Sequence, residues 1–199
     1  KKIIIEKKKE KLNILNIGSG GDIENHLKKN YNFNIFSIDI DPSRKPDAVI
    51  DITKDRFSDV IDFKPDVVLI LEVLEHTTNP FEAINNTYYS MQEENYILMS
   101  VPFIFQIHDE PHDYFRYTFY GVKLLLKKFR NLKIVEKSGF VELLFILIYR
   151  QKTEKKIILK IIGNTFLLLF FILFPLIKIL DYFLYSKKLT MGYYAEGKK

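Results

Sequence analysis

The sequence predicts an α/β fold in which helices cover both faces of a mostly parallel sheet. Short apolar runs rich in β-branched residues alternate with segments of helical periodicity, and Gly, Pro or Asp ends most of the runs. Strands and helices that alternate at this spacing form parallel sheets, because each crossover helix returns the chain to the same edge. The length of 199 residues fits one domain with a sizeable core.

Six strands are expected, at residues 12–18, 33–40, 47–52, 66–73, 95–102 and 132–137. Helices are expected after Gly21 and at residues 53–63, 81–91 and 118–130, the last with Thr118 as its N-cap. Ligands of such sheets bind at the carboxyl ends of the strands, so functional residues are sought directly after each apolar run.

Charge and cysteine content narrow the classes of function. Residues 1–11 hold six lysines against two glutamates, and residues 150–199 hold ten Lys/Arg against three acids, whereas the middle holds 14 basic and 20 acidic residues. This distribution argues against a nucleic-acid groove and favours anionic lipid near the tail, whereas the N-terminal lysines are better explained as a solvated run. Without cysteine, disulfides, thiolate zinc sites and cysteine nucleophiles are excluded.

A glycine loop follows the first strand, in the stretch LNIGSGGD. Its glycines let a ligand approach the backbone closely; they are Gly18, Gly20 and Gly21. Ile23 replaces the third glycine of a dinucleotide fingerprint, and Asp22 near the helix start would repel a pyrophosphate. The loop therefore suits a nucleoside without phosphates, with a simple tight turn as the alternative.

Asp39 ends the second strand about twenty residues after this loop, where a carboxylate accepts both hydrogen bonds of a ribose diol. A helix cap is the alternative for a single acid. The combination of a glycine loop and an acid at the end of the next strand favours the nucleoside site.

At this point the chain resembles a known family. In order, LNIGSGGD, SIDIDPS, DIT, DVVLILEVLEHTTNPFEA and ILMSVP are similar to the motifs of class I S-adenosylmethionine (SAM)-dependent methyltransferases. PFIFQIHDEPHDYFRYT, followed by a helix and a late hydrophobic stretch, resembles the type-11 branch, which is often associated with bacterial surface-polysaccharide synthesis. The resemblance covers most of residues 12–140 and a final strand-like MGYYAEG.

The resemblance implies a Rossmann-like doubly wound sheet of seven strands, with a hydrophobic helical insertion before the last strand. It divides the chain into a SAM-binding core at residues 1–150, the insertion at residues 151–188 and the final strand at residues 189–199.

The same resemblance implies SAM as the cofactor and gives its contacts. The glycine loop would lie against the methionine part, Asp39 would hold the ribose, and the turn after the fourth strand would line the floor beneath the sulfonium. The implied cofactor-binding residues are Asn16, Gly18, Gly20, Gly21, Asp39, Asp51, Ile52, Glu72 and His76. Asp51 and Ile52 would flank the adenine, with Asp51 accepting from its amino group.

Asn16 departs from the family pattern, which usually has an acid two residues before the first glycine. Asparagine can order the loop by hydrogen bonds, but it supplies no negative charge to the methionine ammonium or the sulfonium. This departure raises the alternative of a catalytically inactive binding or scaffold protein at the membrane.

The acceptor side is expected in HDEPHDYFRYT, which follows the fifth strand. A hydroxyl acceptor needs a base, and histidine has a suitable pKa near neutral pH, but the sequence does not choose between His108 and His112. Asp113 completes the expected catalytic set. Tyr114, Arg116 and Tyr117 are expected to bind the acceptor, Arg116 by pairing with a phosphate.

Two alternatives remain for this segment. Its His, Asp and Glu side chains could bind a divalent cation that orients a sugar diol, but Pro111 breaks any helical face of ligands, so no metal ligand is assigned. The segment could also serve only as a lid, with Asp113 paired to Arg116.

The stretch from Ile161 to Ile177 carries no charge and lies between Lys160 and Lys178. As a helix it would be about 26 Å long, marginally short of a bilayer core. A single crossing would also leave the last strand on the wrong side of the membrane. Two alternatives remain for this stretch: a helix in the membrane interface, or a lid over the acceptor pocket. Because the stretch is apolar on every face, the sequence favours peripheral membrane contact through residues 157–185.

The sequence therefore predicts a cytoplasmic enzyme, peripheral on the inner face of the cell membrane. It would move a methyl group from SAM to an acceptor, expected to be a sugar hydroxyl of a glycan or a lipid-linked glycan precursor. A nicotinamide dehydrogenase is disfavoured by Asp22 and Ile23.

Overall fold

The computed structural model describes residues 11–150, 157–184 and 188–199. The lysine-rich run at residues 1–10 and the start of the predicted insertion, residues 151–156, lie outside this range. The strands are β1 (Asn13–Ile17), β2 (Asn34–Asp39), β3 (Ala48–Val49), β4 (Val67–Leu71), β5 (Tyr96–Pro102), β6 (Arg130–Glu136) and β7 (Gly192–Lys198). The α-helices are α2 (Gly21–Asn30), α3 (Phe57–Val60), α4 (Pro80–Ser90), α5 (Phe119–Leu125), α6 (Phe140–Arg150) and α7 (Ile157–Phe183), and two 3₁₀ turns are η1 (Pro42–Arg44) and η2 (Leu74–His76).

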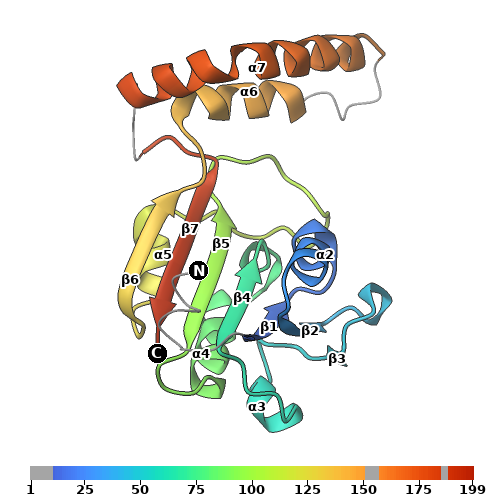
Figure 1. The fold of residues 1–199 in the computed structure, drawn as a ribbon, viewed down its shortest axis with the longest axis vertical. Coiled ribbons are helices and arrows are strands. Elements are labelled where there is room, and N and C mark those ends of the chain that lie inside the picture. Colours follow the sequence, from blue (N-terminus) through green and yellow to red (C-terminus); the bar gives the residue numbers. More distant parts are fainter. Residues whose placement is uncertain (1–10, 151–156, 185–187) are drawn as a thin grey trace.

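The strands form one seven-stranded sheet in the order β3-β2-β1-β4-β5-β7-β6 (Figure 1). Strands β1 to β5 pair in parallel, whereas β7 runs antiparallel to both β5 and β6. The strand order reverses between β1 and β4, which is where doubly wound sheets bind their ligands. This topology confirms the predicted Rossmann-like, mostly parallel sheet with a helical insertion before the last strand.

Helices pack on both faces of the sheet. Phe57 of α3, Ile84 of α4 and Val122 of α5 are buried in the larger core cluster. On the opposite face Leu27 of α2 packs against a smaller cluster that includes Ile14 of β1. The strands read as nearly continuous apolar runs because both of their faces are covered.

The register brings the carboxyl ends of three central strands together. Ile17 at the end of β1 pairs with Ile38 of β2 and with Ile70 of β4. The chain leaves these strands at Gly18, Asp39 and Glu72. Three of the predicted site residues therefore lie at neighbouring strand ends, at one edge of the sheet.

Two helices are shorter than predicted. Of residues 53–63 only α3 is helical, because the amides of Lys54 and Asp55 both donate to the Asp51 carbonyl and form a turn instead. The helix expected at residues 118–130 ends at Leu125, since Arg130 already pairs with β7 as the first residue of β6. Its predicted N-cap is confirmed: the Thr118 hydroxyl accepts from the Gly121 amide at 3.1 Å.

Helices α6 and α7 pack together beyond the ends of β4 and β5 (Figure 1). Asp181 of α7 caps α6, because its carboxylate accepts from the amide of Val141 at 2.7 Å and from that of Glu142 at 3.4 Å. Lys178 adds an ion pair of 2.7 Å to Glu142. Among the described residues, no helix has both the length and the apolar content that crossing a bilayer requires.

Candidate active site

The glycine loop after β1 is held in a conformation that only glycine adopts readily. Gly18 and Gly20 have φ angles of +89° and +84°. A Cβ at Gly18 would lie 2.5 Å from Val73 Cγ2, so the loop packs directly on the segment after β4. A Cβ at Gly20 would meet no atom within 4 Å, so the backbone there is open to a ligand.

A buried carboxylate orders this loop from the first turns of α2. Glu24 Oε2 accepts from Asn16 Nδ2 at 2.7 Å and from the Gly20 amide at 3.1 Å, and Lys28 Nζ lies 2.5 Å from Oε1. Burial raises the pKa of Glu24, but the hydrogen bonds from Lys28, Gly20 and Asn16 outweigh it and hold the pKa below its ordinary value. Sequence analysis missed Glu24; its signal was an acid one turn into the helix, four residues before a lysine.

Asp39 connects the end of β2 to the glycine loop. Its Oδ2 accepts from the Ser19 amide at 2.8 Å, and its Oδ1 accepts from the Asp41 amide at 2.9 Å. Each carboxylate oxygen keeps a further lone pair for a ligand. The acid predicted from its spacing to the loop thus lies in direct contact with it.

The two residues predicted to flank an adenine lie just beyond β3. Asp51 Oδ1 accepts from both the amide and the hydroxyl of Thr53, at 3.0 and 2.6 Å, and Oδ2 pairs with Lys54 at 2.9 Å. The Ile52 side chain is buried, and its carbonyl accepts from Asn86 Nδ2 at 3.1 Å. Their role toward adenine stays a prediction.

The segment after β4 carries three ionisable side chains at the carboxyl edge. Glu72 accepts from the Ser100 hydroxyl at 2.6 Å and pairs with Lys137 at 2.7 Å. Glu75, in the turn η2, is fully buried, and neither of its carboxylate oxygens has a hydrogen-bond partner. Burial, and after it the negative charge of Glu72, raise the pKa of Glu75 to about 8. Glu75 was not among the predicted site residues.

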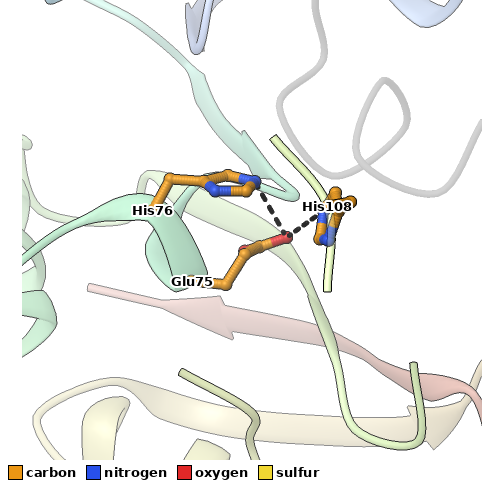
Figure 2. A group of neighbouring side chains, drawn as sticks. All are labelled: Glu75, His76 and His108. Atoms are coloured by element: carbon orange, nitrogen blue, oxygen red, sulfur yellow. Dashed lines mark ion pairs between the residues drawn. The ribbon is translucent and has the colours of Figure 1, made fainter. Parts of the chain in front are cut away.

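Two histidines face the Glu75 carboxylate from different segments of the chain (Figure 2). His76 Nε2 lies 3.8 Å and His108 Nε2 lies 4.0 Å from Glu75 Oε1. The two imidazole rings meet edge to face, with centroids 4.8 Å apart. The structure therefore brings together a predicted cofactor residue, a predicted catalytic residue and the unpredicted Glu75.

The other predicted catalytic residues lie around this cluster. Asp113 Oδ2 accepts from the His108 amide at 2.8 Å and lies 3.3 Å from His108 Nδ1. His112 is exposed, and its ring Nδ1 lies 2.7 Å from the Tyr114 hydroxyl. The His112 carbonyl, 2.6 Å from His76 Nδ1, accepts a hydrogen bond from that ring.

Arg116 holds the loop after β5 in place. It binds Asp113 in a bidentate manner, at 2.6 and 2.7 Å, and donates further to the carbonyls of Phe105, Gln106 and Phe115. The hydrogen bond from Arg116 holds the pKa of Asp113 well below its usual range. The Asp113–Arg116 pair foreseen in the lid alternative is present.

The predicted acceptor-binding tyrosines differ in their surroundings. Tyr117 is buried, and its hydroxyl donates to the Leu74 carbonyl at 2.8 Å. Tyr114 is exposed, and its amide donates to the Glu75 carbonyl at 2.8 Å. Both residues thus tie the loop after β5 to η2, and only the Tyr114 ring is open to a ligand.

Comparison with known proteins gives the fold its context. No model of a protein family matches the sequence, and no curated protein matches it. Among solved structures, a SAM-dependent methyltransferase from Archaeoglobus fulgidus has a TM-score of 0.60 at 20% identity, over 94% of this chain and 86% of that one. The chain has the SAM-dependent methyltransferase fold.

Two further neighbours show how widely this fold is used. The phosphoethanolamine N-methyltransferase 2 of Haemonchus contortus, solved with S-adenosyl-L-methionine, has a TM-score of 0.56 at 12% identity, over 94% of this chain and 48% of that one. The cyclase SpnF has a TM-score of 0.57 at 11% identity, over 94% of this chain and 75% of that one. The reaction must therefore be argued from the site.

Proposed function

We propose that the protein is a SAM-dependent methyltransferase. The observation that carries the proposal is the glycine loop at the switch point of the sheet, open above Gly20 and tied by Ser19 to Asp39. This arrangement suits a nucleoside ligand, since the loop admits close approach and Asp39 retains lone pairs for ribose hydroxyls. The negative charge that Asn16 lacks is supplied at the same loop by Glu24.

SAM would lie along this edge, against the residues inferred from the sequence. SAM supplies a methyl group on a sulfonium, whose transfer to oxygen breaks a C–S bond, forms a C–O bond and leaves one proton to be accepted. The loop at Gly18 and Gly20 and the carboxylate of Asp39 would hold the ligand. Asp51, Ile52, Glu72 and His76 would border it, as the resemblance implies.

The proposed acceptor is a sugar hydroxyl of a glycan or lipid-linked glycan precursor. A hydroxyl needs help in losing its proton, and the cluster of Glu75, His76 and His108 supplies acid–base groups at the edge where the acceptor would enter. His108 and His112 are the proposed bases. The resemblance to the polysaccharide-associated branch supports the sugar, and transfer to an amine would contradict this part of the proposal.

We also propose that α6 and α7 hold the enzyme at the inner face of a membrane. Large apolar side chains are exposed on the described part of the pair, among them Leu144, Ile148, Leu168, Ile172, Leu176, Ile179 and Phe183. Lysines flank this surface in the sequence, as in interfacial helices that bind anionic lipid. Arg150 at the end of α6 lies 4.2 Å from the ring centroid of Phe105, so the pair abuts the acceptor loop.

Calorimetric titration in mild detergent with SAM, S-adenosylhomocysteine and NADH tests the cofactor. We expect the two adenosyl ligands to bind and NADH not to bind. Asp39→Asn should weaken binding of S-adenosylhomocysteine about tenfold, whereas Asp41→Asn, which alters an exposed acid two residues away, should leave it unchanged. Binding of NADH alone would support a dehydrogenase, and adenosyl binding without transfer to any glycan would support the scaffold.

Co-sedimentation with vesicles of phosphatidylglycerol and phosphatidylethanolamine tests the membrane contact. The triple variant with Leu168, Ile172 and Leu176 changed to serine should lose most of its binding. The matched control changes Ile40 and Val60, which are exposed and distant in the sequence from α6 and α7, to serine. Equal sedimentation of the triple variant and the control would exclude α7 as the membrane-binding element.

A further inference from the structure

We infer that Glu75, His76 and His108 form a binding site for one divalent transition-metal ion. The site itself stands on the geometry of these residues, while the catalytic use of the ion rests on the proposed function. One ligand atom from each residue lies within 4.8 Å of the others.

Glu75 is the first part of the argument, because a buried polar group that makes no hydrogen bond lacks the partner that such groups ordinarily have. Its carboxylate is fully buried and accepts no hydrogen bond. The nearby cations are engaged elsewhere, since Lys137 pairs with Glu72 at 2.7 Å and Arg116 pairs with Asp113. A cation between Glu75 and the two imidazoles would satisfy the carboxylate.

The second part is the orientation of the His76 ring. Its Nδ1 lies 2.6 Å from the His112 carbonyl, and a carbonyl oxygen only accepts, so this nitrogen carries the proton. In the neutral ring the lone pair is then on Nε2, which faces Glu75 at 3.8 Å. Metal-binding histidines characteristically place their other nitrogen on a carbonyl or carboxylate in this way.

His108 has a similar arrangement, in which a carboxylate oxygen takes the place of the carbonyl oxygen. Its Nδ1 is buried without a hydrogen bond and lies 3.3 Å from Asp113 Oδ2, while its Nε2 faces Glu75 at 4.0 Å. A slight ring rotation would let Nδ1 donate to Asp113 and aim Nε2 at a shared ion. Both histidines therefore have the supporting oxygen atom that orients a ligand.

The ligand set indicates the class of ion. Two imidazoles and one carboxylate suit Zn²⁺, Mn²⁺ or Fe²⁺ better than Mg²⁺ or Ca²⁺, which prefer oxygen ligands. Metal–ligand bonds of about 2.1 Å would place neighbouring ligand atoms roughly 3.0–3.5 Å apart. The three side chains therefore need to move only slightly to bind one ion. The His76 and His108 side chains are 21% and 22% exposed, which leaves one side open for an exchangeable oxygen ligand.

The position of the site deepens the proposed function. Glu75 is two residues from Val73, which packs on Gly18 of the cofactor loop. An ion here would bind the acceptor hydroxyl and lower its pKa, so that the proton released on C–O bond formation passes to a base or to water. His108 would then be a ligand, and of the two proposed bases only His112 would remain outside the ligand set.

Titration of the chelator-treated full chain with ZnCl₂ and with MnCl₂ tests the site. We expect one saturable site per chain in the wild type and a loss of affinity of about 100-fold in Glu75→Gln and in His108→Ala. His26→Ala is the matched control, since this ring is outside the cluster, and it should bind as the wild type does. Circular dichroism checks that each variant is folded, and a separate titration with S-adenosylhomocysteine tests the cofactor site.

The outcomes separate the site from the function. The inference is overturned if the wild type takes up neither ion at a single site, or if Glu75→Gln and His108→Ala bind as tightly as His26→Ala. If one of the two variants fails to fold, the other decides. If the wild type binds metal but not S-adenosylhomocysteine, the metal site stands and the methyltransferase proposal fails. If metal binds but the chelator-treated enzyme retains full methyl transfer, the binding site stands and only the catalytic role of the ion is excluded.

Discussion

Asn16 Nδ2 donates a hydrogen bond of 2.7 Å to Oε2 of Glu24, eight residues later in the chain. The same oxygen accepts from the Gly20 amide, so one carboxylate connects the end of β1 to the glycine loop. Asn16 therefore does not leave the loop without an acid, because the charge comes from the helix that follows. This relationship weakens the main argument for a scaffold protein.

Replacing Glu24 by alanine should loosen the cofactor loop. The change removes charge-assisted hydrogen bonds to Gly20 and Asn16, and we expect affinity for S-adenosylhomocysteine to fall by about 1–2 kcal/mol, roughly tenfold. The control is Lys28→Ala, which removes the helical ion pair but leaves the hydrogen bonds of Glu24 to Asn16 and to the Gly20 amide in place. Calorimetry measures both, and equal affinities in the two variants would contradict the role of Glu24.

The lowered pKa of Glu24 predicts a dependence of stability on pH. A carboxyl group with a depressed folded-state pKa stabilises the fold above its unfolded pKa, near 4.5, and this contribution disappears as the pH falls through the folded value. The wild type should therefore exceed Glu24→Gln in free energy of unfolding at neutral pH, with the difference shrinking at acid pH. Urea denaturation between pH 7 and pH 3 measures this difference, and a gap that widens on acidification would refute the assignment.

Gly139→Ala should disturb the packing of α6 on α7. An added Cβ would overlap the carboxylate of Asp181, and overpacking of this kind costs about 1–3 kcal/mol. Hydrogen exchange of the Val141 amide, which donates to Asp181, reports the change directly as faster exchange. Gly121→Ala is the control, because its Cβ would lie at an ordinary 3.5 Å from Thr118 Oγ1. If the Val141 amide exchanged at the same rate in Gly139→Ala as in the wild type, the Asp181 cap would be excluded as a constraint on α6.

Arg116→Lys distinguishes a structural from a substrate-binding role. Lysine cannot reproduce the bidentate pair with Asp113 together with three carbonyl contacts, so we expect a loss of about 1–3 kcal/mol in unfolding free energy. Arg44→Lys, at an exposed site, should change little. A higher KM for a phosphorylated acceptor with unchanged stability would instead support the predicted phosphate contact.

Local patterns were sufficient for most of the fold. Apolar runs located six of the seven strands to within a few residues, and the last strand was expected from the family resemblance. Asp39, selected by its spacing from the glycine loop, contacts that loop through Ser19. The same reasoning overextended the helix at residues 53–63, where the bonds to Asp51 favour a turn. It also did not predict α6, whose first turn is capped by Asp181, forty positions after Val141.

By itself the sequence determined the fold class, the succession of the first six strands and the glycine loop, because strand period, glycine and capping signals act over a few residues. Tertiary structure alone decided which acid serves that loop and which histidine faces a carboxylate. Glu75 is one of two acids in LEVLEH, and only the turn η2 buries it against His108, 33 residues later. Burial and long-range distance are properties of the packed chain, so the chemistry of the site emerged only with the fold.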